Sequence, residues 1–228
     1  MSFLVAQDIS IHFGGVKAVQ DLSFSVEQGE VFSIVGPNGA GKTTIFNLIS
    51  RIYDTTRGSI HFKGQDITRL ATNQVAQLGI ARTFQNIELF ENETVLNNLL
   101  IGCHVHRETN LFEELFFLSR VRQQELQFRT SVEDIIDLLD LQSYRHQLIS
   151  NLPYGVRKMV EIARALSIKP SLLLLDEPSS GLNPEETEDL SFWLEDINEE
   201  LGITIIMVEH DMKLVAQSSD RVLAVADG

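Results

Sequence analysis

Apolar runs of strand length, separated by turns rich in glycine and polar residues, dominate the two ends of the chain. Residues 9–13 alternate between apolar and polar side chains, and a second alternating stretch follows a Gly-Gly turn and ends at Val26. A period of two residues is typical of a strand with one buried face. The first 26 residues are therefore predicted to form an antiparallel β region.

Further short apolar runs are predicted to be strands, at residues 31–35, 58–62, 79–84, 204–208 and 222–225. The run of four leucines at 172–175 has no polar position, as expected of a strand buried on both faces. Asn183, Pro184 and two glutamates predict a helix start, and Gly202 predicts its end. The predicted buried face of that helix consists of Leu190, Trp193, Leu194, Ile197 and Leu201.

The middle of the chain, from residue 94 to about 148, has helical patterning and few glycines. It is predicted to be an inserted helical subdomain. Ser131 with Asp134 resembles a capping box and predicts that an amphipathic helix begins there. For the aromatic and leucine cluster of residues 110–126, core packing is favoured over a protein-docking surface. Its members are Leu111, Phe112, Leu115, Phe116, Phe117 and Leu118.

The stretch GPNGAGKTT between the run 31–35 and a helical pattern matches the phosphate-binding loop G-x-x-x-x-G-K-[ST] at every fixed position. Its backbone N–H groups are expected to hold phosphates, with Lys42 on the outer phosphates and the Thr43 hydroxyl on Mg²⁺. A glycine-rich turn with no ligand is disfavoured by this strand-to-helix context. The residues expected to bind the nucleotide are Gly36, Pro37, Asn38, Gly39, Ala40, Gly41, Lys42, Thr43 and Thr44.

Two carboxylates, Asp176 and Glu177, follow the leucine strand. Asp176 is expected to hold Mg²⁺ through its water shell, and Glu177 to orient a water molecule for in-line attack on a terminal phosphoryl group. A solvated carboxylate pair is the competing interpretation, which the phosphate-binding loop in the same chain disfavours.

Four further positions are ambiguous on the residues alone. Phe13 is predicted to be a core residue, with a stacking face for a purine ring as the second possibility. Gln85 is an exposed loop amide or a sensor of metal and attacking water. His210 is structural or a contact to a terminal phosphate. Gly155 lies near a helix start, which could bind an anion.

Composition narrows the classes of partner and location. The formal net charge is −14 and the sequence pI is near 4.8, so there is no general attraction to nucleic acid or anionic lipid. No apolar run reaches the roughly 18 residues of a membrane span, and the first ten residues lack a signal-peptide pattern. A cytosolic location is expected. Cys103 and two nearby histidines lack the spacing of a metal site.

Taken in order, GPNGAGKTT, Gln85, LPYG before a helix, LLLLDEP and His210 resemble the ATP-binding subunit of ABC transporters across essentially the whole chain. The runs ARTFQNIELF, SSGLNPEET and VEHDMKLV look like the subunits that energise branched-chain amino acid importers. Related importers of urea or other amides have similar runs. Lipid exporters use the same cassette, and soluble ABC-type ATPases acting on nucleic acid or translation are a further class that resembles this chain.

The resemblance implies ATP and Mg²⁺ as ligands and assigns roles. Phe13 would stack on adenine, and Gln85 would link Mg²⁺ and water to the helical subdomain. Glu177 would be the catalytic base, and His210 would touch the γ-phosphate. Two copies, or this chain and a homologous subunit, would close head to tail. Each would offer its signature loop, Leu152, Pro153, Tyr154, Gly155 and Val156, to the ATP bound by its partner.

The same resemblance implies the organisation and location of the protein. The fold would be α/β, a P-loop NTPase core of RecA-like type with an N-terminal antiparallel β region and an inserted α-helical subdomain. Residues 1–86 and 165–228 would form the core and 87–164 the subdomain, within one domain. The subdomain would dock on membrane permeases at the inner face of the cell membrane, with a substrate-binding protein as an indirect partner and no nucleic acid.

Three departures from the family pattern stand out. The commonest signature, LSGGQ, is replaced by LPYGV, in which Pro153 lacks the serine hydroxyl and Val156 replaces an amide. Asn183 stands where an aspartate is usual, which keeps a cap but removes a charge. Importer subunits usually continue past a turn such as 226–228, so a shortened C-terminus is expected.

Overall fold

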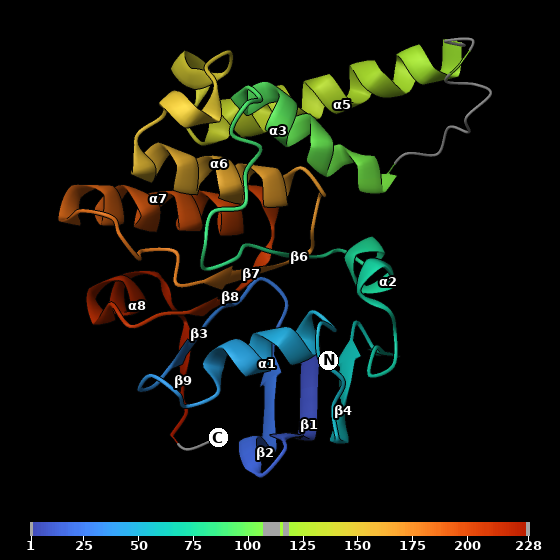
Figure 1. Cartoon of the computed structure of the whole chain (residues 1–228), viewed down its shortest axis with the longest axis vertical. Helices are drawn as coiled ribbons and strands as arrows, with labels where there is room; N and C mark the ends of the chain where they lie inside the picture. Colours follow the sequence, from blue (N-terminus) through green and yellow to red (C-terminus); the bar gives the residue numbers. More distant parts are fainter. Residues whose placement is uncertain (1, 107–114, 116–118, 227–228) are drawn as a thin grey trace. The chain divides into compact units, whose positions relative to one another are not determined.

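The structure is a computed structural model that describes residues 2–106, 115 and 119–226. The chain divides into two compact units: unit 1 comprises residues 1–85 and 171–228, and unit 2 comprises residues 86–170. The second boundary lies after the helix that ends at Leu166, six residues beyond the boundary expected from the sequence. Figure 1 follows the chain through both units.

An antiparallel sheet of four strands forms one part of unit 1. Its strands are β1 (Leu4–Phe13), β2 (Val16–Val26), β4 (Arg57–Phe62) and β5 (Gln65–Asp66), in the order β2-β1-β4-β5. β1 pairs with both β2 and β4. The predicted antiparallel β region is thereby confirmed.

Phe13 is not the core residue that alternation favoured, because its ring is 45% exposed. It is the last residue of β1, at the tip of the β1–β2 hairpin. Its ring packs edge-to-face against Tyr53, with the centroids 5.1 Å apart.

The second sheet of unit 1 is parallel, and two of its strands lead into the phosphate-binding loop and the Asp176–Glu177 pair. Its strands are β6 (Ile80–Arg82), β7 (Leu172–Asp176), β8 (Thr204–Val208), β3 (Val31–Val35) and β9 (Arg221–Ala224), in the order β6-β7-β8-β3-β9. All neighbours are parallel, so every strand delivers its last residue to the same edge. β7 and β8 are buried along their whole length, which the leucine run had predicted for β7.

The described residues of unit 1 form the helices α1 (Lys42–Ile49), α2 (Thr72–Gln77), α7 (Pro184–Leu201) and α8 (Met212–Ser218). α1 contacts both β2 and β7, and its Phe46 and Ile45 join a core shared by the two sheets. The predicted start of α7 is confirmed, because the Asn183 side chain accepts hydrogen bonds from the N–H groups of Glu185 and Glu186. Leu201, predicted to be buried, is exposed because it is the last residue of the helix.

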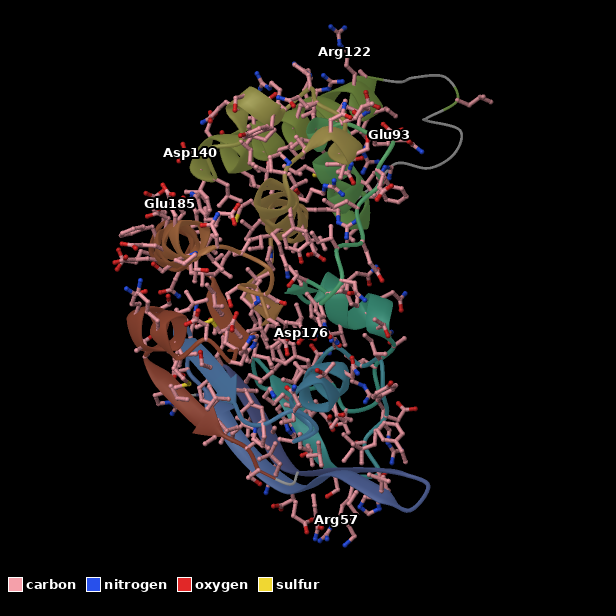
Figure 2. The ribbon with its side chains drawn as sticks, turned by 60° about the vertical axis from the view of Figure 1, so that its left-hand side comes forward. Arg57, Glu93, Arg122, Asp140, Asp176 and Glu185 are labelled. Atoms are coloured by element: carbon pink, nitrogen blue, oxygen red, sulfur yellow. The ribbon has the colours of Figure 1, made fainter. Side chains whose placement is uncertain are left out.

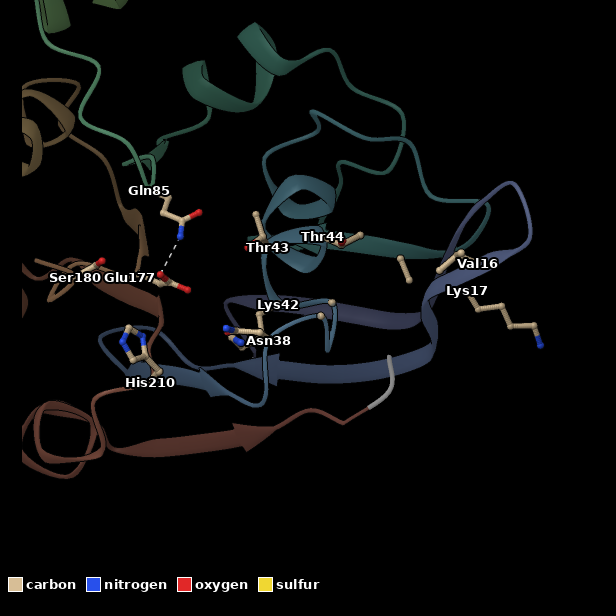
Figure 3. Close-up of a pocket in the computed structure, with 13 residues that line it drawn as sticks. Val16, Lys17, Asn38, Lys42, Thr43, Thr44, Gln85, Glu177, Ser180 and His210 are labelled. Carbon is tan, nitrogen blue, oxygen red and sulfur yellow. Dashed lines mark hydrogen bonds between the residues drawn. The ribbon is translucent and has the colours of Figure 1, made fainter.

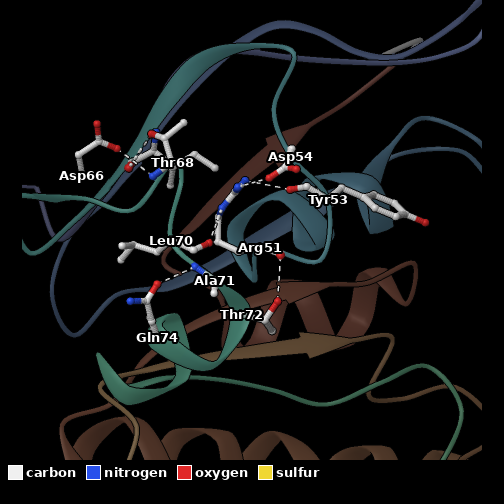
Figure 4. A network of polar contacts seen from close by, with 10 residues as sticks. Arg51, Tyr53, Asp54, Asp66, Thr68, Leu70, Ala71, Thr72 and Gln74 are labelled. Atoms are coloured by element: carbon white, nitrogen blue, oxygen red, sulfur yellow. Dashed lines mark hydrogen bonds and ion pairs between the residues drawn. The ribbon is translucent and has the colours of Figure 1, made fainter.

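Arg51 lies two residues beyond the end of α1, the helix that follows the phosphate-binding loop. Its backbone has a left-handed φ of 60°, a conformation that costs a non-glycine residue about 1 kcal/mol. Its buried guanidinium donates to the carbonyls of Leu70 and Tyr53, at 3.3 and 2.9 Å, and pairs with Asp54. Figure 4 shows these contacts and the Thr72 hydroxyl on the Arg51 carbonyl. Arg51 therefore connects the loop after α1 to the loop before α2.

Unit 2 is helical in its described part. It contains α3 (Val95–Gly102), η1 (Cys103–His106), α5 (Ser119–Leu138), η2 (Gln142–Tyr144), η3 (Ile149–Asn151) and α6 (Tyr154–Leu166). α3 packs on α5 and α6, closely enough that a Cβ at Gly102 would lie 2.7 Å from the Arg164 carbonyl. Across the described residues, no helix combines the length and apolarity needed to cross a bilayer.

The capping-box prediction at Ser131 is wrong, because Ser131 lies within α5 rather than at its start. The preceding residues include arginine, glutamine, glutamate and leucine, which are good helix formers and carry the helix through. Most of the aromatic and leucine cluster lies outside the described residues. Its described member Leu115 is 74% exposed.

Candidate functional site

The phosphate-binding loop connects the end of β3 to the start of α1, as its motif predicts. A Cβ at Gly36 would lie 2.1 Å from the Val225 carbonyl oxygen, and one at Gly41 would lie 2.3 Å from the Ala18 carbonyl oxygen. Gly39 has a φ of 85° and open space where a Cβ would project. Glycine is therefore required at two positions by packing and at the third by backbone conformation.

Lys42 is buried against its own loop. Its Nζ donates to the carbonyl oxygens of Gly36 at 2.8 Å and Pro37 at 3.1 Å. These contacts satisfy a buried ammonium group, which would otherwise be costly. The Lys42 side chain therefore folds back over the loop, and its ammonium group lies against the residues that precede α1.

A cavity of about 870 Å³ lies over this loop and is formed entirely by unit 1. Figure 3 shows Gln85, Glu177, Ser180 and His210 on one side of it, Lys42 and Thr43 in the middle, and Val16 and Lys17 on the other side. Asn38, Gly39, Gly41 and Thr44 also line the cavity. Phe13 does not line it, although its strand partner Val16 does.

Asp176 is the last residue of β7 and is enclosed by other side chains, whereas Glu185 on α7 is exposed (Figure 2). Its Oδ2 accepts a hydrogen bond from Arg82 Nη2 at 2.9 Å. The guanidinium also donates to Asn47 Oδ1 at 2.6 Å and Ser50 Oγ at 3.1 Å. A buried carboxylate is thus balanced by a buried cation that is anchored on α1.

Glu177 has a left-handed φ of 50°, which is uncommon for a residue with a side chain. Its N–H donates to the Val208 carbonyl, which fixes the backbone at this turn. The Oε2 atom accepts a hydrogen bond from Gln85 Nε2 at 3.0 Å. Positive φ at a polar residue beside a pocket is the kind of strain that accumulates at functional sites.

His210 follows β8 and Glu209, and its side chain is 61% exposed at the cavity. Its N–H donates to Glu209 Oε2 at 2.9 Å. The imidazole can therefore contact solvent or a ligand, while the hydrogen bond to Glu209 fixes the His210 backbone.

The signature segment belongs to unit 2. Leu152 is buried, Pro153 occupies the N-cap position of α6, and Tyr154 is 46% exposed at its first residue. Arg157 closes the loop by donating to the Leu152 carbonyl at 2.9 Å. Gly155 is the second residue of the helix, as predicted, and Val156 is the third.

The groups around the cavity fit a nucleotide and a hard divalent cation. The glycine positions bring backbone toward the cavity, and Lys42 supplies a cation for phosphate. Thr43 and Gln85 line the cavity and offer a hydroxyl and an amide oxygen, which are donors of the kind that Mg²⁺ prefers. The Asp176 carboxylate is a donor of the same kind, but it is buried at the end of β7 and is not among the residues that line the cavity.

Sequence reasoning missed several residues of this site. No sequence pattern assigns a role to Arg82, Ser180, Val16, Lys17, Ala18 or Glu209. A cation inside a predicted strand was the available signal for Arg82, since a buried arginine needs a partner. No short sequence pattern marks the other residues, because they come together in the cavity only when distant parts of the chain fold onto one another.

Comparison with known proteins identifies the family. The ABC transporter family pattern matches residues 19–180. The chain is 37% identical to the high-affinity branched-chain amino acid transport ATP-binding protein BraF of Pseudomonas aeruginosa, covering 99% of this chain and 88% of BraF. It is 36% identical to LivG of Escherichia coli, which carries the same description, with the same coverage.

Solved structures agree with the sequence comparison. The ADP conformation of MJ1267, an ATP-binding cassette of an ABC transporter, has a TM-score of 0.87 at 31% identity, covering 100% of this chain and 89% of that one. A nucleotide-free cassette from an ABC transporter has a TM-score of 0.86 with the same identity and coverage. The predicted fold class is confirmed. The chain belongs to the ABC transporter family, as an ATP-binding, ATP-hydrolysing cassette that uses ATP with Mg²⁺.

Proposed function

We propose that this chain is the ATP-hydrolysing subunit of an importer of branched-chain or similar amino acids. The similarity to BraF and LivG over 99% of the chain supports the transported class. The observation that carries the chemistry is the contact of Gln85 Nε2 with Glu177 Oε2 beside the phosphate-binding loop. It brings a carboxylate that can accept a proton next to an amide that can hold it in place.

Nucleotide binding would use the loop from Gly36 to Thr44. Lys42 would exchange the carbonyl oxygens of Gly36 and Pro37 for outer phosphate oxygens, which are stronger acceptors for an ammonium group. Thr44 and the first N–H groups of α1 would hold the inner phosphates. Phe13 would stack on the adenine, which its exposed ring supports.

Metal binding would use Thr43, Gln85 and Asp176. Bound Mg²⁺ would neutralise negative charge on the phosphate oxygens during transfer. Arg82 would hold the Asp176 carboxylate in one orientation, since the ion pair fixes one of its oxygens.

Hydrolysis would use Glu177 as the general base that takes a proton from the attacking water. Gln85 would hold the Glu177 carboxylate, and His210 would contact the terminal phosphate from the exposed side of the cavity. Lys42 would offset negative charge on the transferred group.

The assembly would contain two cassettes, this chain with a second copy or a homologous subunit, closed head to tail. The signature residues Leu152–Val156 would meet the ATP of the partner, which the exposed Tyr154 and the start of α6 support. The helical segment 87–164 would dock on membrane permeases at the cytoplasmic face of the membrane. A substrate-binding protein would act through those permeases, and nucleic acid would not be a partner.

The test is Glu177→Gln, with Glu195→Gln on the exposed surface of α7 as the control. Loss of the base is expected to lower ATP turnover by about 10² to 10⁴-fold while ATP binding persists. Steady-state phosphate release and equilibrium binding of ATP measure the two effects. Equal turnover in wild type and Glu177→Gln would reject the role of Glu177.

The transported class has a separate test. Wild type and Glu177→Gln are each co-expressed with the permeases encoded by adjacent genes. Uptake of radiolabelled leucine and of urea is then measured. Leucine uptake that depends on Glu177 supports the proposal, and urea uptake alone contradicts it.

A further inference from the structure

Glu209 is a buried carboxylate that none of the roles above uses. It follows β8 directly, and no part of the residue is exposed to solvent. A carboxylate in this environment is costly unless hydrogen bonds replace its water. Its position next to His210 places it beneath the site rather than at a distant part of the fold.

Its two oxygens are divided between two loops. Oε1 accepts the N–H of Ser179 at 2.8 Å. Oε2 accepts the N–H groups of His210 at 2.9 Å and Asp211 at 3.1 Å. Ser179 lies 30 residues earlier in the chain, so this one side chain joins segments that are distant in sequence.

Both segments carry residues that line the cavity. Glu177 and Ser180 flank the Ser179 contact, and His210 donates its own N–H to Glu209. The strand ends beneath are also tied, since Glu177 N–H donates to the Val208 carbonyl. The Glu209 carboxylate adds a second link, because it connects the loop after β7, through Ser179, to the loop after β8, through His210 and Asp211.

We propose that Glu209 is a positioning residue that fixes the loop of Glu177 and Ser180 relative to His210, and so sets the geometry of the hydrolytic site. This inference rests on the proposed function. The residue acts through His210 and the Ser179 backbone and does not itself touch the nucleotide.

The chemistry of the bridge requires a carboxylate of this length. Glutamine offers one carbonyl oxygen, and its NH₂ group would face a backbone N–H, so one loop would lose its acceptor. Aspartate keeps the charge but is one methylene shorter. It can still reach the N–H groups of the next two residues, but it withdraws from Ser179.

The experiment compares Glu209→Gln and Glu209→Asp with Glu30→Gln. Glu30 is the control, because its buried carboxylate also accepts a backbone N–H, that of Glu27 at 2.7 Å, and in addition pairs with Arg221 Nε. It precedes β3 and lies at the opposite end of the strand from the phosphate-binding loop. The kcat and KM for ATP, the melting temperature and amide exchange at residues 179–180 and 210–211 are measured. Both Glu209 variants are expected to lower kcat about tenfold, with KM changed less than about twofold.

A cycle with His210→Ala separates positioning from general destabilisation. Glu209→Gln is expected to lower kcat by less than about twofold when His210 is already absent, because coupled residues are not additive. Glu30→Gln lowers the melting temperature while kcat stays at the wild-type value. Full additivity with His210→Ala, or an equal loss of kcat in Glu30→Gln, overturns the inference.

Amide exchange tests the Glu209 bridge without depending on ATP hydrolysis. In Glu209→Asp the Ser179 amide is expected to exchange about tenfold faster, while that of His210 is retained. Unchanged exchange at Ser179 overturns the inference even if ATP is hydrolysed. A wild-type protein without ATP turnover rejects the proposed function instead, and the exchange data still decide the bridge. If neither Glu209 variant folds, Glu209 is a folding residue and the inference is rejected.

Discussion

Arg82 and Asp176 form a buried ion pair at the end of the parallel sheet, with Nη2 and Oδ2 2.9 Å apart. The two side chains are 8% and 2% exposed. The same guanidinium contacts Asn47 and Ser50 on α1 and lies over the rings of Phe46 and Phe84. One cation thereby connects β6, β7 and the helix that follows the phosphate-binding loop.

Replacing Arg82 by methionine is expected to destabilise the protein by about 3 to 5 kcal/mol, because Asp176 would remain as a buried charge without its cation. Urea unfolding measures the change. Arg57→Met is the matched control. Its pair with Asp21 is exposed, with side chains 75% and 52% accessible, and should contribute less than about 1 kcal/mol. Equal losses in the two variants would contradict the importance of the buried pair.

Gly41→Ala is expected to cost far more than Gly29→Ala. Both glycines have left-handed φ values, 93° and 76°, so the backbone strain is similar. A Cβ at Gly41 would also collide with the Ala18 carbonyl, whereas one at Gly29 meets nothing within 4 Å. Gly29→Ala should cost about 1 to 2 kcal/mol and keep ATP binding. Gly41→Ala should lose ATP binding as well, and binding at wild-type affinity would refute the close packing of the loop.

Asn98→Ala is expected to loosen the segment that follows Gln85. The Asn98 amide is fully buried, accepts the Phe90 N–H at 2.9 Å and donates to the carbonyls of Phe90 and Thr94. Its loss leaves buried backbone groups without partners and should cost about 1 to 3 kcal/mol. Faster amide exchange at Phe90 is the readout. Asn97→Ala, which removes an exposed contact to Glu93, should leave that exchange rate unchanged.

The thiol of Cys103 is expected to react slowly with alkylating reagents until the protein unfolds. Burial raises its pKa, so the neutral thiol persists at mildly alkaline pH and the reactive thiolate is scarce. Labelling followed by mass spectrometry, with and without denaturant, gives the rates. Equal rates would show that the thiol is accessible in the folded chain.

Asp66 should titrate below its ordinary pKa. Hydrogen bonds from the side chain and the backbone N–H of Thr68 hold its pKa down. Because the folded pKa is lowered, the contribution to stability is present above the unfolded pKa and is lost as pH falls through the folded pKa. Thr68→Val is expected to raise the Asp66 pKa toward its ordinary value by NMR titration. An unchanged titration would assign the shift to another group.

The parts of the fold that were predictable from sequence are those set by local patterns. The phosphate-binding loop, the leucine strand β7 and the cap at Asn183 each depend on residues a few positions apart. The Ser131 motif failed because a capping pattern is also compatible with a helix interior. The core prediction for Phe13 was wrong because alternation identifies the face of a strand but not how far each residue on that face is buried.

The contacts that organise the site were less predictable, because they join distant positions. Arg82 and Asp176 are 94 residues apart, and Gln85 and Glu177 are 92 residues apart. Only the sheet order β6-β7-β8 brings these residues to one edge. The sequence shows which side chains are chemically able to pair, but the order of the strands determines which of them are close enough to do so.

The hydrogen bonds of Lys42 to the carbonyls of Gly36 and Pro37 have a consequence for the speed of binding. The loop is already folded around an ammonium group, so an arriving triphosphate does not wait for the chain to order. Association should then be limited by encounter rather than by ordering of the loop. The slow steps of the cycle would come after nucleotide capture.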